Sequence, residues 1–378
     1  MTTTKNNEHK KLNVPNLRFP EFQGEWITYK IKDVLSIGNG RDYKHLSNGE
    51  IPVFGTGGYM TSVDECLYDG ETTFIGRKGS INKPFYYNGK FWTVDTLFYT
   101  HSFNGITPKF TYCLFQTINW LKYNEASGVP SLSKDTIEKI KIKIPGLEEQ
   151  NQIAKLMFAL DERISTQNKI IEDLKKLKSA IIDYAINSID ADFIKFSSLY
   201  EIAGEGGTPT TSNASFYDNG KIPFIKIDDL KKKYLTENKD FITELGLQKS
   251  SAWLVPSRSI LFSNGATIGE ITITTYPVCT KQGILGIVPK SNIDVEFLYY
   301  FMSSSYFKKA VSRIVTEGTM KTAYLKDINS IRCPIPTKGK QHEIAQMPSA
   351  LSSKIDFEQS ILKLFYAQKQ YLLRQMFI

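Results

Sequence analysis

The feature that most limits how this chain can fold is a segment that occurs twice. Residues 144–164 read IPGLEEQNQIAKLMFALDERI, and residues 335–355, which begin 191 positions later, read IPTKGKQHEIAQMPSALSSKI. Aligned without a gap, residues 144–186 and 335–377 share ten identities in 43 positions. A repeat of this length, placed once at the middle and once at the end, predicts an internal pseudo-two-fold arrangement.

Both copies have the apolar spacing of a long amphipathic helix, with charged residues between apolar positions three, four or seven apart. A helix from Leu147 to Ile186 is about 60 Å long, and alone it would expose its apolar stripe to water. We therefore expect the two helices to pair with each other. The residues expected to make this pairing are Leu160, Ile164, Ile171, Leu174, Leu351, Ile355, Leu362 and Phe365. The alternative is that each helix packs on its own globular domain.

Polar residues and a proline modify this expectation. The middle of the stripe is polar in both copies, at Gln167, Asn168, Glu358 and Gln359. Such residues in a helix seam fix the register at some cost in stability. Pro348 stands where the first copy has Met157, and an interior proline removes a helix hydrogen bond. We expect a kink or restart there, with the second long helix proper beginning near Ser349.

A globular stretch of ordinary domain size precedes each helix. Both stretches are rich in short β-prone runs that Gly, Asn and Pro interrupt. They correspond at an offset of 171 around Ile51-Pro52 and Ile222-Pro223, and at 187 for residues 75–82 against 262–269. Drift by insertion is expected when two domains keep one scaffold but bind different targets with their loops.

The expected organisation is α+β, with two mixed α/β domains separated by two long helices. The expected boundaries are a flexible tail at 1–12, a first domain at 13–146, a helix at 147–187, a second domain at 188–336 and a helix at 337–378.

The net charge of +8, with a pI near 9.0, favours a polyanionic partner such as nucleic acid. The four cysteines lie far apart without a CxxC spacing, so zinc or a disulfide framework is not expected and a reducing cytoplasm is the simpler interpretation. The polar start lacks the apolar core of a signal peptide, and no stretch approaches the length of a membrane helix.

The motifs of common catalytic sites are missing from the sequence. There is no phosphate-binding GxxxxGK[ST] loop, no GxGxxG after a strand, no GxSxG elbow and no Asn-Pro-Pro-Tyr-like loop for a flipped adenine. Residues 227–233, IDDLKKK, place two carboxylates beside lysines, as a metal-dependent nuclease would, but such runs are common on solvated turns. We expect a non-catalytic chain that itself holds no metal or cofactor.

Binding chemistry is better represented in the loops. Glycines allow close approach of the backbone, an Arg fork matches a guanine edge, an amide matches adenine, and a carboxylate accepts from cytosine. The candidate DNA-binding residues of the first domain are Gly57, Gly58, Tyr59, Arg77, Lys78, Ser80 and Asn82. Those of the second are Thr208, Thr210, Lys226, Asp228, Asn264, Thr267, Lys281 and Gln282. The alternative at each position is an ordinary glycine turn with a surface charge.

Several segments, in the same order in both halves, resemble one known family. The first half contains NVPNLRFPEFQGEW (13–26), GTGGYM, FIGRKGSIN and FWTVDTLFY, and the second contains GEGGTPTTSNASFYDNGKIPFIKIDDL. The joins to the helices read SLSKDTIEKIKIKIPGLEEQNQIA and DINSIRCPIPTKGKQHEIA, and the chain ends with LLRQMFI. Together they are similar to the specificity (S) subunits of type I restriction-modification enzymes.

This resemblance implies that each domain is a target recognition domain that reads one half of a split double-stranded DNA site. The two helices would pair as an antiparallel coiled coil that fixes the gap between the half-sites. Two methyltransferase (modification) subunits would dock on the chain and carry S-adenosylmethionine for adenine methylation, and restriction subunits would carry ATP and Mg for translocation and cleavage. A competing hypothesis is an adaptor that binds other proteins through two β-rich modules on a helical hairpin.

Overall fold

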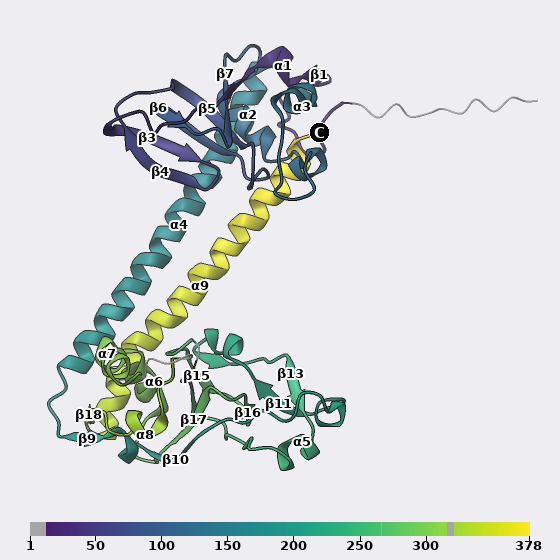
Figure 1. The fold of residues 1–378 in the computed structure, drawn as a ribbon. Coiled ribbons are helices and arrows are strands. Elements are labelled where there is room, and N and C mark those ends of the chain that lie inside the picture. Colours follow the sequence, from purple (N-terminus) through teal and green to yellow (C-terminus); the bar gives the residue numbers. More distant parts are fainter. Residues whose placement is uncertain (1–12, 266, 316–320) are drawn as a thin grey trace, which may run out of the picture. The chain divides into compact units, whose positions relative to one another are not determined.

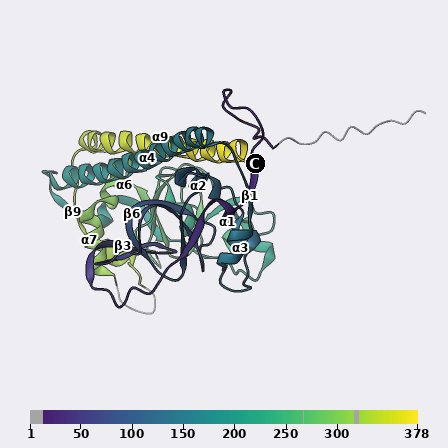
Figure 2. The same cartoon turned by 90° about the horizontal axis from the view of Figure 1, so that it is seen from above.

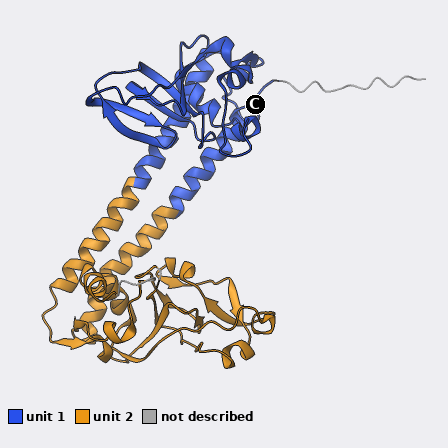
Figure 3. Ribbon diagram, viewed as in Figure 1, with its two compact units in different colours: residues 1–168, 360–378 blue, residues 169–359 orange. Residues whose placement is uncertain are grey.

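The computed structural model describes residues 13–265, 267–315 and 321–378. The chain divides into unit 1, residues 1–168 with 360–378, and unit 2, residues 169–359 (Figure 3). Two long helices, α4 (Leu147–Asn187) and α9 (Lys338–Met376), each contribute residues to both units. The expected tail at 1–12 lies outside the described residues. Within the described ranges, no helix combines the length and hydrophobicity of a membrane span.

The centre of unit 1 is a six-stranded sheet with the order β2-β7-β5-β6-β3-β4 (Figure 1). Neighbouring strands are antiparallel except β3 and β6, which are parallel. The strands are β2 (Ser36–Asn39), β3 (Asn48–Gly55), β4 (Gly58–Val63), β5 (Tyr68–Gly76), β6 (Phe85–Thr93) and β7 (Leu97–His101). A separate ladder joins β1 (Ile27–Lys30) to β8 (Lys141–Ile144). The helical elements are α1 (Ile31–Val34), α2 (Pro108–Phe115), the 3₁₀ turn η1 (Trp120–Tyr123) and α3 (Lys134–Lys139).

Unit 2 has a five-stranded sheet, β10-β17-β14-β15-β12, a three-stranded sheet, β13-β11-β16, and the ladder β9-β18. The strands are β9 (Phe193–Lys195), β10 (Tyr200–Glu205), β11 (Ile222–Ile225), β12 (Tyr234–Leu235), β13 (Asp240–Ile242), β14 (Ile260–Ser263), β15 (Ile271–Thr274), β16 (Cys279–Thr280), β17 (Ile284–Pro289) and β18 (Arg332–Pro334). The helices are α5 (Glu244–Gln248), α6 (Val295–Ser303), α7 (Ser305–Ile314) and α8 (Leu325–Ile328). Short 3₁₀ turns are η2 (Phe196–Ser198), η3 (Ala214–Phe216) and η4 (Ile227–Lys231).

Strand pairing repeats between the units in the register that the sequence offsets predict. In unit 1, β3 and β6 pair in parallel, with Phe54 opposite Thr93. In unit 2, β11 and β16 also pair in parallel, with Ile225 opposite Thr280. Adding 171 to the first number and 187 to the second converts one pair into the other. Most neighbouring strands are antiparallel in both units, and unit 2 has one further parallel pair, β12 with β15. A parallel pair at an equivalent position in both units indicates a common scaffold.

Each unit has its own hydrophobic core. In unit 1 the ring of Phe377, near the end of the chain, stacks on Phe110 of α2 at 5.4 Å and meets Trp26 edge-on at 6.2 Å. In unit 2 the ring of Phe307 lies 5.5 Å from Phe196 and 6.0 Å from Phe262. All of these rings except Phe377, which is 7% exposed, are no more than 2% exposed, and burial of such rings is a main source of stability.

A buried glutamine ties each long helix to its globular part in the same way. Gln150 Oε1 accepts from Thr107 N–H (2.8 Å), and its Nε2 donates to the carbonyls of Gly105 and Pro145 (2.9 Å each). Gln341 is one of the ten identical positions, 191 residues later, and repeats this set of bonds. It uses Asp294 N–H (2.8 Å) and the carbonyls of Asn292 (3.3 Å) and Pro336 (2.9 Å). Thr107 and Asp294 also cap the first turns of α2 and α6, so the glutamine fixes the start of a helix in each unit.

Within each unit, a segment of α4 lies beside a segment of α9, as both views show (Figures 1 and 2). In unit 1, Lys369 Nζ forms an ion pair with Asp161. In unit 2, Lys178 Nζ donates to Ser352 Oγ at 3.4 Å. At the offset of 191, Lys178 corresponds to Lys369 and Asp161 to Ser352, so the two contacts are reciprocal. Such reciprocity is what a two-fold relation between the repeats requires.

The residues expected to pair the helices avoid solvent. The first group, 5–7% exposed, consists of Leu160, Ile164, Ile171 and Ile355. The second group, which is half-buried, consists of Leu174, Leu351, Leu362 and Phe365. The polar mid-stripe residues Gln167 and Glu358 are 7% exposed. At its ends α4 packs on globular cores instead, through Met157 in unit 1 and Ile182 in unit 2.

The expected restart of the second helix near Ser349 is wrong. The helix α9 is unbroken from Lys338 to Met376, with Pro348 inside it. Pro348 has no N–H for the carbonyl of Ile344, but side chains on the following turn make other bonds. Ser349 Oγ accepts from the hydroxyl of Tyr300 (3.1 Å), and Ser352 Oγ donates to Pro348 O (2.9 Å). These contacts hold the helix through the proline.

Candidate nucleic-acid interface

Three loops of unit 1 are joined by backbone hydrogen bonds: the β3–β4 turn, the loop after β5 and the β6–β7 loop. Val94 N–H donates to Phe54 O (3.0 Å), which holds the β6–β7 loop against the end of β3. Arg77 N–H donates to Thr96 O (2.8 Å), which holds the loop after β5 against the same β6–β7 loop. The loops are therefore a rigid group of neighbours, although up to 42 residues of chain separate them.

Unit 2 joins its equivalent loops with the equivalent bonds. Lys281 N–H donates to Ile225 O (2.9 Å), and Asn264 N–H donates to Gly283 O (3.0 Å). The offsets of 171 and 187 convert the two bonds of unit 1 into these two. The loops that carry most of the candidate residues are thus held by one backbone frame in both halves of the chain.

In unit 1 a pocket of about 560 Å³ opens among these loops. Its lining includes Lys44, Thr56, Gly57, Met60, Asp95 and Thr96. Gly58 has a φ of +104°, a conformation that favours glycine, and this lets the β3–β4 turn reverse tightly. Beside the pocket the ring of Tyr59 is 64% exposed. Of the expected residues, Gly57 lines the pocket itself, while Gly58 and Tyr59 belong to its edge.

The loop that follows β5 presents the remaining expected residues of unit 1. Lys78, Ser80 and Asn82 are exposed. Arg77 is half-buried, donates from Nη1 to Asp95 O (3.3 Å) and lies over the ring of Phe98 at 5.9 Å. Arg77 therefore holds the loop in place, and its three exposed neighbours are the side chains most available to a ligand.

The structure brings most of the expected residues of unit 2 together. A pocket of about 650 Å³ is lined by six of them: Thr208, Lys226, Asp228, Thr267, Lys281 and Gln282. Thr208 is fixed by its own contact, since its Oγ1 accepts from Gln282 N–H (3.4 Å). Thr210 is exposed two residues further along the loop after β10. The pocket positions Lys226–Asp228 and Lys281–Gly283 are equivalent to Gly55–Gly57 and Val94–Thr96 of the first pocket.

The two linings differ in charge and size although their positions correspond. Lys281-Gln282 stands where unit 1 has Val94-Asp95. Asp228, whose side chain is 91% exposed, stands where unit 1 has Gly57. The second pocket therefore offers an ammonium, an amide and a carboxylate, all of which can bond to base edges in a groove.

The prediction that the side chain of Asn264 faces DNA is wrong, because this side chain is buried. Its side chain is 1% exposed, and its Nδ2 donates to Ala323 O (3.3 Å) instead of facing the pocket. Ala323 N–H also donates to Asn264 O (2.8 Å), just as Leu132 N–H donates to the carbonyl of Arg77 (2.9 Å) in unit 1. Asn264 therefore builds the frame and does not contact a ligand in this pocket.

Sequence reasoning missed several residues that share the pocket of unit 2. Tyr324, 47% exposed, lines it together with Glu205, whose Oε1 accepts from Gly283 N–H (2.8 Å). Tyr324 lies in the segment that leads into α9, and the equivalent residue of unit 1 is Ser133. An aromatic residue at this position was the available signal for Tyr324. In unit 1, Asp95 and Lys44 also line the pocket and were missed, because each is a single charged residue without a motif around it.

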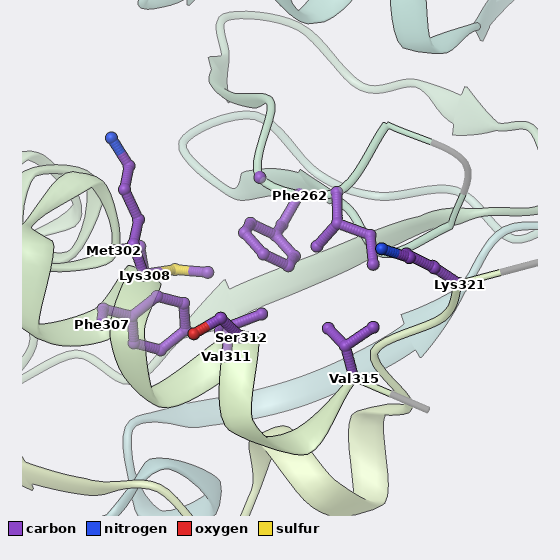
Figure 4. Close-up of a pocket in the computed structure, with 10 residues that line it drawn as sticks. Phe262, Met302, Phe307, Lys308, Val311, Ser312, Val315 and Lys321 are labelled. Atoms are coloured by element: carbon purple, nitrogen blue, oxygen red, sulfur yellow. The ribbon is translucent and has the colours of Figure 1, made fainter. Parts of the chain in front are cut away.

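A second cavity of unit 2, of about 460 Å³, is lined mainly by apolar side chains, together with Lys308, Ser312 and Lys321 (Figure 4). Phe262, Phe307, Val311 and Val315 point into it. At the position of Phe307 unit 1 has the larger Trp120, whose ring is buried and whose Nε1 donates to Phe115 O (2.8 Å). The side chain at this position is thus smaller in unit 2, and the mainly apolar walls of the cavity do not suit the reading of base edges.

The IDDLKKK run lies on η4 and its exit, and both of its carboxylates have partners close in the sequence. Asp228 forms an ion pair with Lys231 (3.0 Å), and Asp229 Oδ2 accepts from Lys226 N–H (2.9 Å). Among the described residues, no group of three or more His, Cys, Asp or Glu side chains could hold a metal ion. The nuclease interpretation therefore finds no support in this part of the chain.

Comparison with known proteins identifies the family to which this chain belongs. Residues 23–176 and 189–364 each match the type I restriction modification DNA specificity domain. The specificity subunit of the type I restriction enzyme MjaX from Methanocaldococcus jannaschii is 25% identical, with 93% of this chain and 92% of the relative covered. A second specificity subunit of that organism, MjaVIII, is 26% identical over 77% of this chain and 72% of the relative.

The fold is similar to that of a solved protein. The crystal structure of the S subunit of a type I restriction-modification system from M. genitalium superposes with a TM-score of 0.63 at 16% identity, covering 97% of this chain and 99% of that chain. The two matched domains span both candidate pockets and the segments that hold them. The chain therefore belongs to the type I restriction-modification DNA specificity domain family, carries two such domains, and has the function of a type I specificity subunit.

Proposed function

We propose that each of the two pockets, with its surrounding loops, reads one half of a bipartite double-stranded DNA site. The observation that supports this most strongly is the combination of one backbone frame with two different linings. A shared frame presents both loop sets to the same kind of ligand. Different side chains at equivalent positions, such as Lys281 and Val94, then select different bases.

The proposed DNA contacts of unit 1 are Gly57, Gly58, Tyr59, Lys78, Ser80 and Asn82, with Arg77 as a contact and a support. Those of unit 2 are Thr208, Thr210, Lys226, Asp228, Thr267, Lys281 and Gln282, now joined by Tyr324. Alternating lysine and carboxylate side chains in the second set disfavour binding by charge alone. They suit recognition by shape and base edges in addition to phosphate contacts.

The two long helices are proposed to pair as an antiparallel coiled coil that sets the gap between the half-sites. The reciprocal contacts Asp161–Lys369 and Ser352–Lys178 support an antiparallel pairing, because each joins an early position of one repeat to a late position of the other. A ruler of this kind fixes the helical phase of the second half-site relative to the first, and DNA turns once in about 10 base pairs.

Catalysis is proposed to belong to partner subunits. Two methyltransferase subunits would bring S-adenosylmethionine and flip the target adenines, and restriction subunits would bring ATP and Mg. Large apolar side chains are exposed on the long helices and are candidates for covering by these partners: Leu156, Ile170, Leu177, Tyr184, Phe357, Leu364 and Tyr371. Exposed apolar residues in a row at heptad spacing, as on both helices, are typical of a helix-docking surface.

The test is a base-resolution map of methylated adenines in DNA treated with this chain and its partner methyltransferase. The proposal predicts one motif with two defined parts and a gap of fixed length. Methylation without sequence preference would contradict it and would favour the adaptor hypothesis. A motif with only one defined part would show that a single pocket reads DNA.

A further inference from the structure

Lys233, the last residue of the IDDLKKK run, is the one lysine of that run whose side chain is largely buried. Its side chain is 11% exposed, whereas that of the adjacent Lys232 is 69% exposed. Lys233 follows the DNA-facing turn η4 and leads directly into β12. Its carbonyl accepts from Ile273 N–H (2.8 Å), which secures the backbone to the edge of β15.

The ammonium group of Lys233 is enclosed by side chains of α6. It forms an ion pair with Glu296 and donates to the hydroxyl oxygen of Tyr300 (2.8 Å). It also lies over the rings of Tyr300 and Tyr234 at 4.6 and 4.8 Å. Burial by itself would lower the pKa of Lys233, but the bonds to Glu296 and Tyr300 outweigh this and raise it. The group is therefore a cation at neutral pH and keeps its partners in place.

The same ammonium reaches the long helix α9. Lys233 Nζ donates to Ser349 Oγ at 3.0 Å. The hydroxyl of Tyr300 is hydrogen-bonded to two serines of α9, Ser349 (3.1 Å) and Ser352 (3.3 Å). Ser352 in turn accepts from Lys178 of α4 (3.4 Å). One connected polar network thus runs from the DNA-facing turn through α6 to both long helices, all within unit 2.

Unit 1 has no copy of this network at the equivalent described positions. The equivalent of Ser349 is Phe158, whose ring meets Tyr86 at 5.0 Å and Tyr112 at 5.7 Å. The equivalent of Tyr300 is Cys113, which is fully buried. At these equivalent positions, aromatic contacts join the first domain to its helix, whereas directional bonds from one lysine join the second.

We propose that Lys233 is a positioning residue for spacer-length discrimination: it locks the second recognition domain onto α9, so that the pocket of unit 2 meets DNA at one distance from the first half-site. Directional bonds suit this role, because a hydrogen bond weakens steeply when its angle or length changes, whereas apolar contacts tolerate sliding. This inference rests on the proposed bipartite reading and adds the residue that holds its geometry.

The test uses the full chain with its partner methyltransferase and DNA duplexes that carry both mapped half-sites. The gap between the half-sites is varied by one or two base pairs around the preferred length. In Lys233→Met, methylation at the wrong gap lengths relative to the preferred one should rise about threefold to tenfold, since the net contribution of a typical hydrogen bond is a factor of that order. The bases of both half-sites should stay the same.

Lys232→Met is the matched control, because it removes the same charge from the adjacent position, where the lysine only pairs with Glu237 on the surface (2.9 Å). Its gap profile should equal that of the parent chain. The readout is a ratio between gap lengths, so a smaller folded fraction lowers all values together and does not change it. Ser349→Ala removes only the contact on α9 and should shift the profile in the same direction as Lys233→Met, by less.

An unchanged gap profile in both Lys233→Met and Ser349→Ala would overturn the inference. A change in the bases of the second half-site would also overturn it, since Lys233 would then act on reading and not on position. If Lys233→Met does not fold, the result of Ser349→Ala decides. Should the parent chain itself show no bipartite motif, the proposed function fails first, and the two failures are thereby distinguished.

Discussion

Units 1 and 2 are built on the same frame but differ in how they use polar groups. Equivalent backbone hydrogen bonds join the loops around both pockets, and an equivalent glutamine, Gln150 or Gln341, anchors each long helix. In unit 1, however, an ion pair of Arg18 with Glu149 fastens the start of α4, while the equivalent residue of α9 is the exposed Lys340. Unit 2 instead has the Lys233 network where unit 1 has aromatic rings.

This difference teaches which parts of a duplicated domain are free to change. Backbone hydrogen bonds can form whatever side chain a residue carries, proline excepted. The hydrogen bonds that join the loops are therefore retained while the sequence changes. Side-chain networks need particular partners, and each unit has its own set. We infer that the frame determines that DNA is read, and that the side chains determine which bases are read and how firmly each reader is held.

The largest effect should come from exchanging pocket residues between the units. Replacing Lys281 and Gln282 by the Val and Asp of unit 1 should lower methylation of the original site about 100-fold, because each base contact contributes about 1–3 kcal/mol. Measured rates on a randomised library should show a changed second half-site and an unchanged first one. Lys290→Val, an exposed lysine after β17, is the control and should leave both intact. A change in the first half-site would contradict separate readers.

A smaller effect, on the free energy of unfolding, is expected from removing the carboxylate of Glu149 that holds the start of α4. Glu149 is 3% exposed and accepts from Arg18 Nε (2.8 Å) and Nη2 (2.7 Å) and from Trp26 Nε1 (3.3 Å). Glu149→Ala leaves these donors without their acceptor and should cost about 3 kcal/mol of unfolding free energy.

Urea unfolding followed by tryptophan fluorescence measures this loss, because three of the four tryptophans, including Trp26, lie in unit 1. Lys340→Ala at the equivalent position removes only a surface pair with Glu343 and should cost less than about 0.5 kcal/mol. Equal losses in the two variants would show that this asymmetry has no energetic weight.

The smallest difference in stability loss between the units is expected at the two equivalent glutamines, Gln150 and Gln341. Gln150→Ala and Gln341→Ala each remove three hydrogen bonds of matching geometry, and each should cost about 2 kcal/mol. Their urea midpoints should shift by similar amounts. A large loss in one variant and none in the other would break the equivalence of the two anchors.

Much of this frame could be predicted from the sequence, because repeats constrain one another. The offsets of 171 and 187 identify which loops of the two units are equivalent, and the offset of 191 identifies the repeated helices. The strand pairs and helix contacts of the structure follow these offsets. Loops with glycine and polar residues at equivalent places pointed to most of the pocket of unit 2. Local sequence was sufficient here because the same pattern occurs twice.

Other features depend on partners that are distant in the chain. Asn264 looked like a reader of bases, but its amide bonds to Ala323, 59 residues away, and this turns it inward. Lys233 looked like a third solvated lysine, and only Glu296 and Tyr300 make it a buried group. Pro348 was expected to break α9, but contacts from Tyr300 stabilise the turn. No pattern in the neighbouring residues signals these contacts.

The central claim is that two independent readers are held at a set distance by a pair of repeated helices. The most direct measurement inserts one heptad into α4 and one at the equivalent position of α9, and then maps methylated adenines with the partner methyltransferase. We predict a longer gap between two unchanged half-sites. Altered half-sites, or the original gap retained with normal activity, would contradict the account.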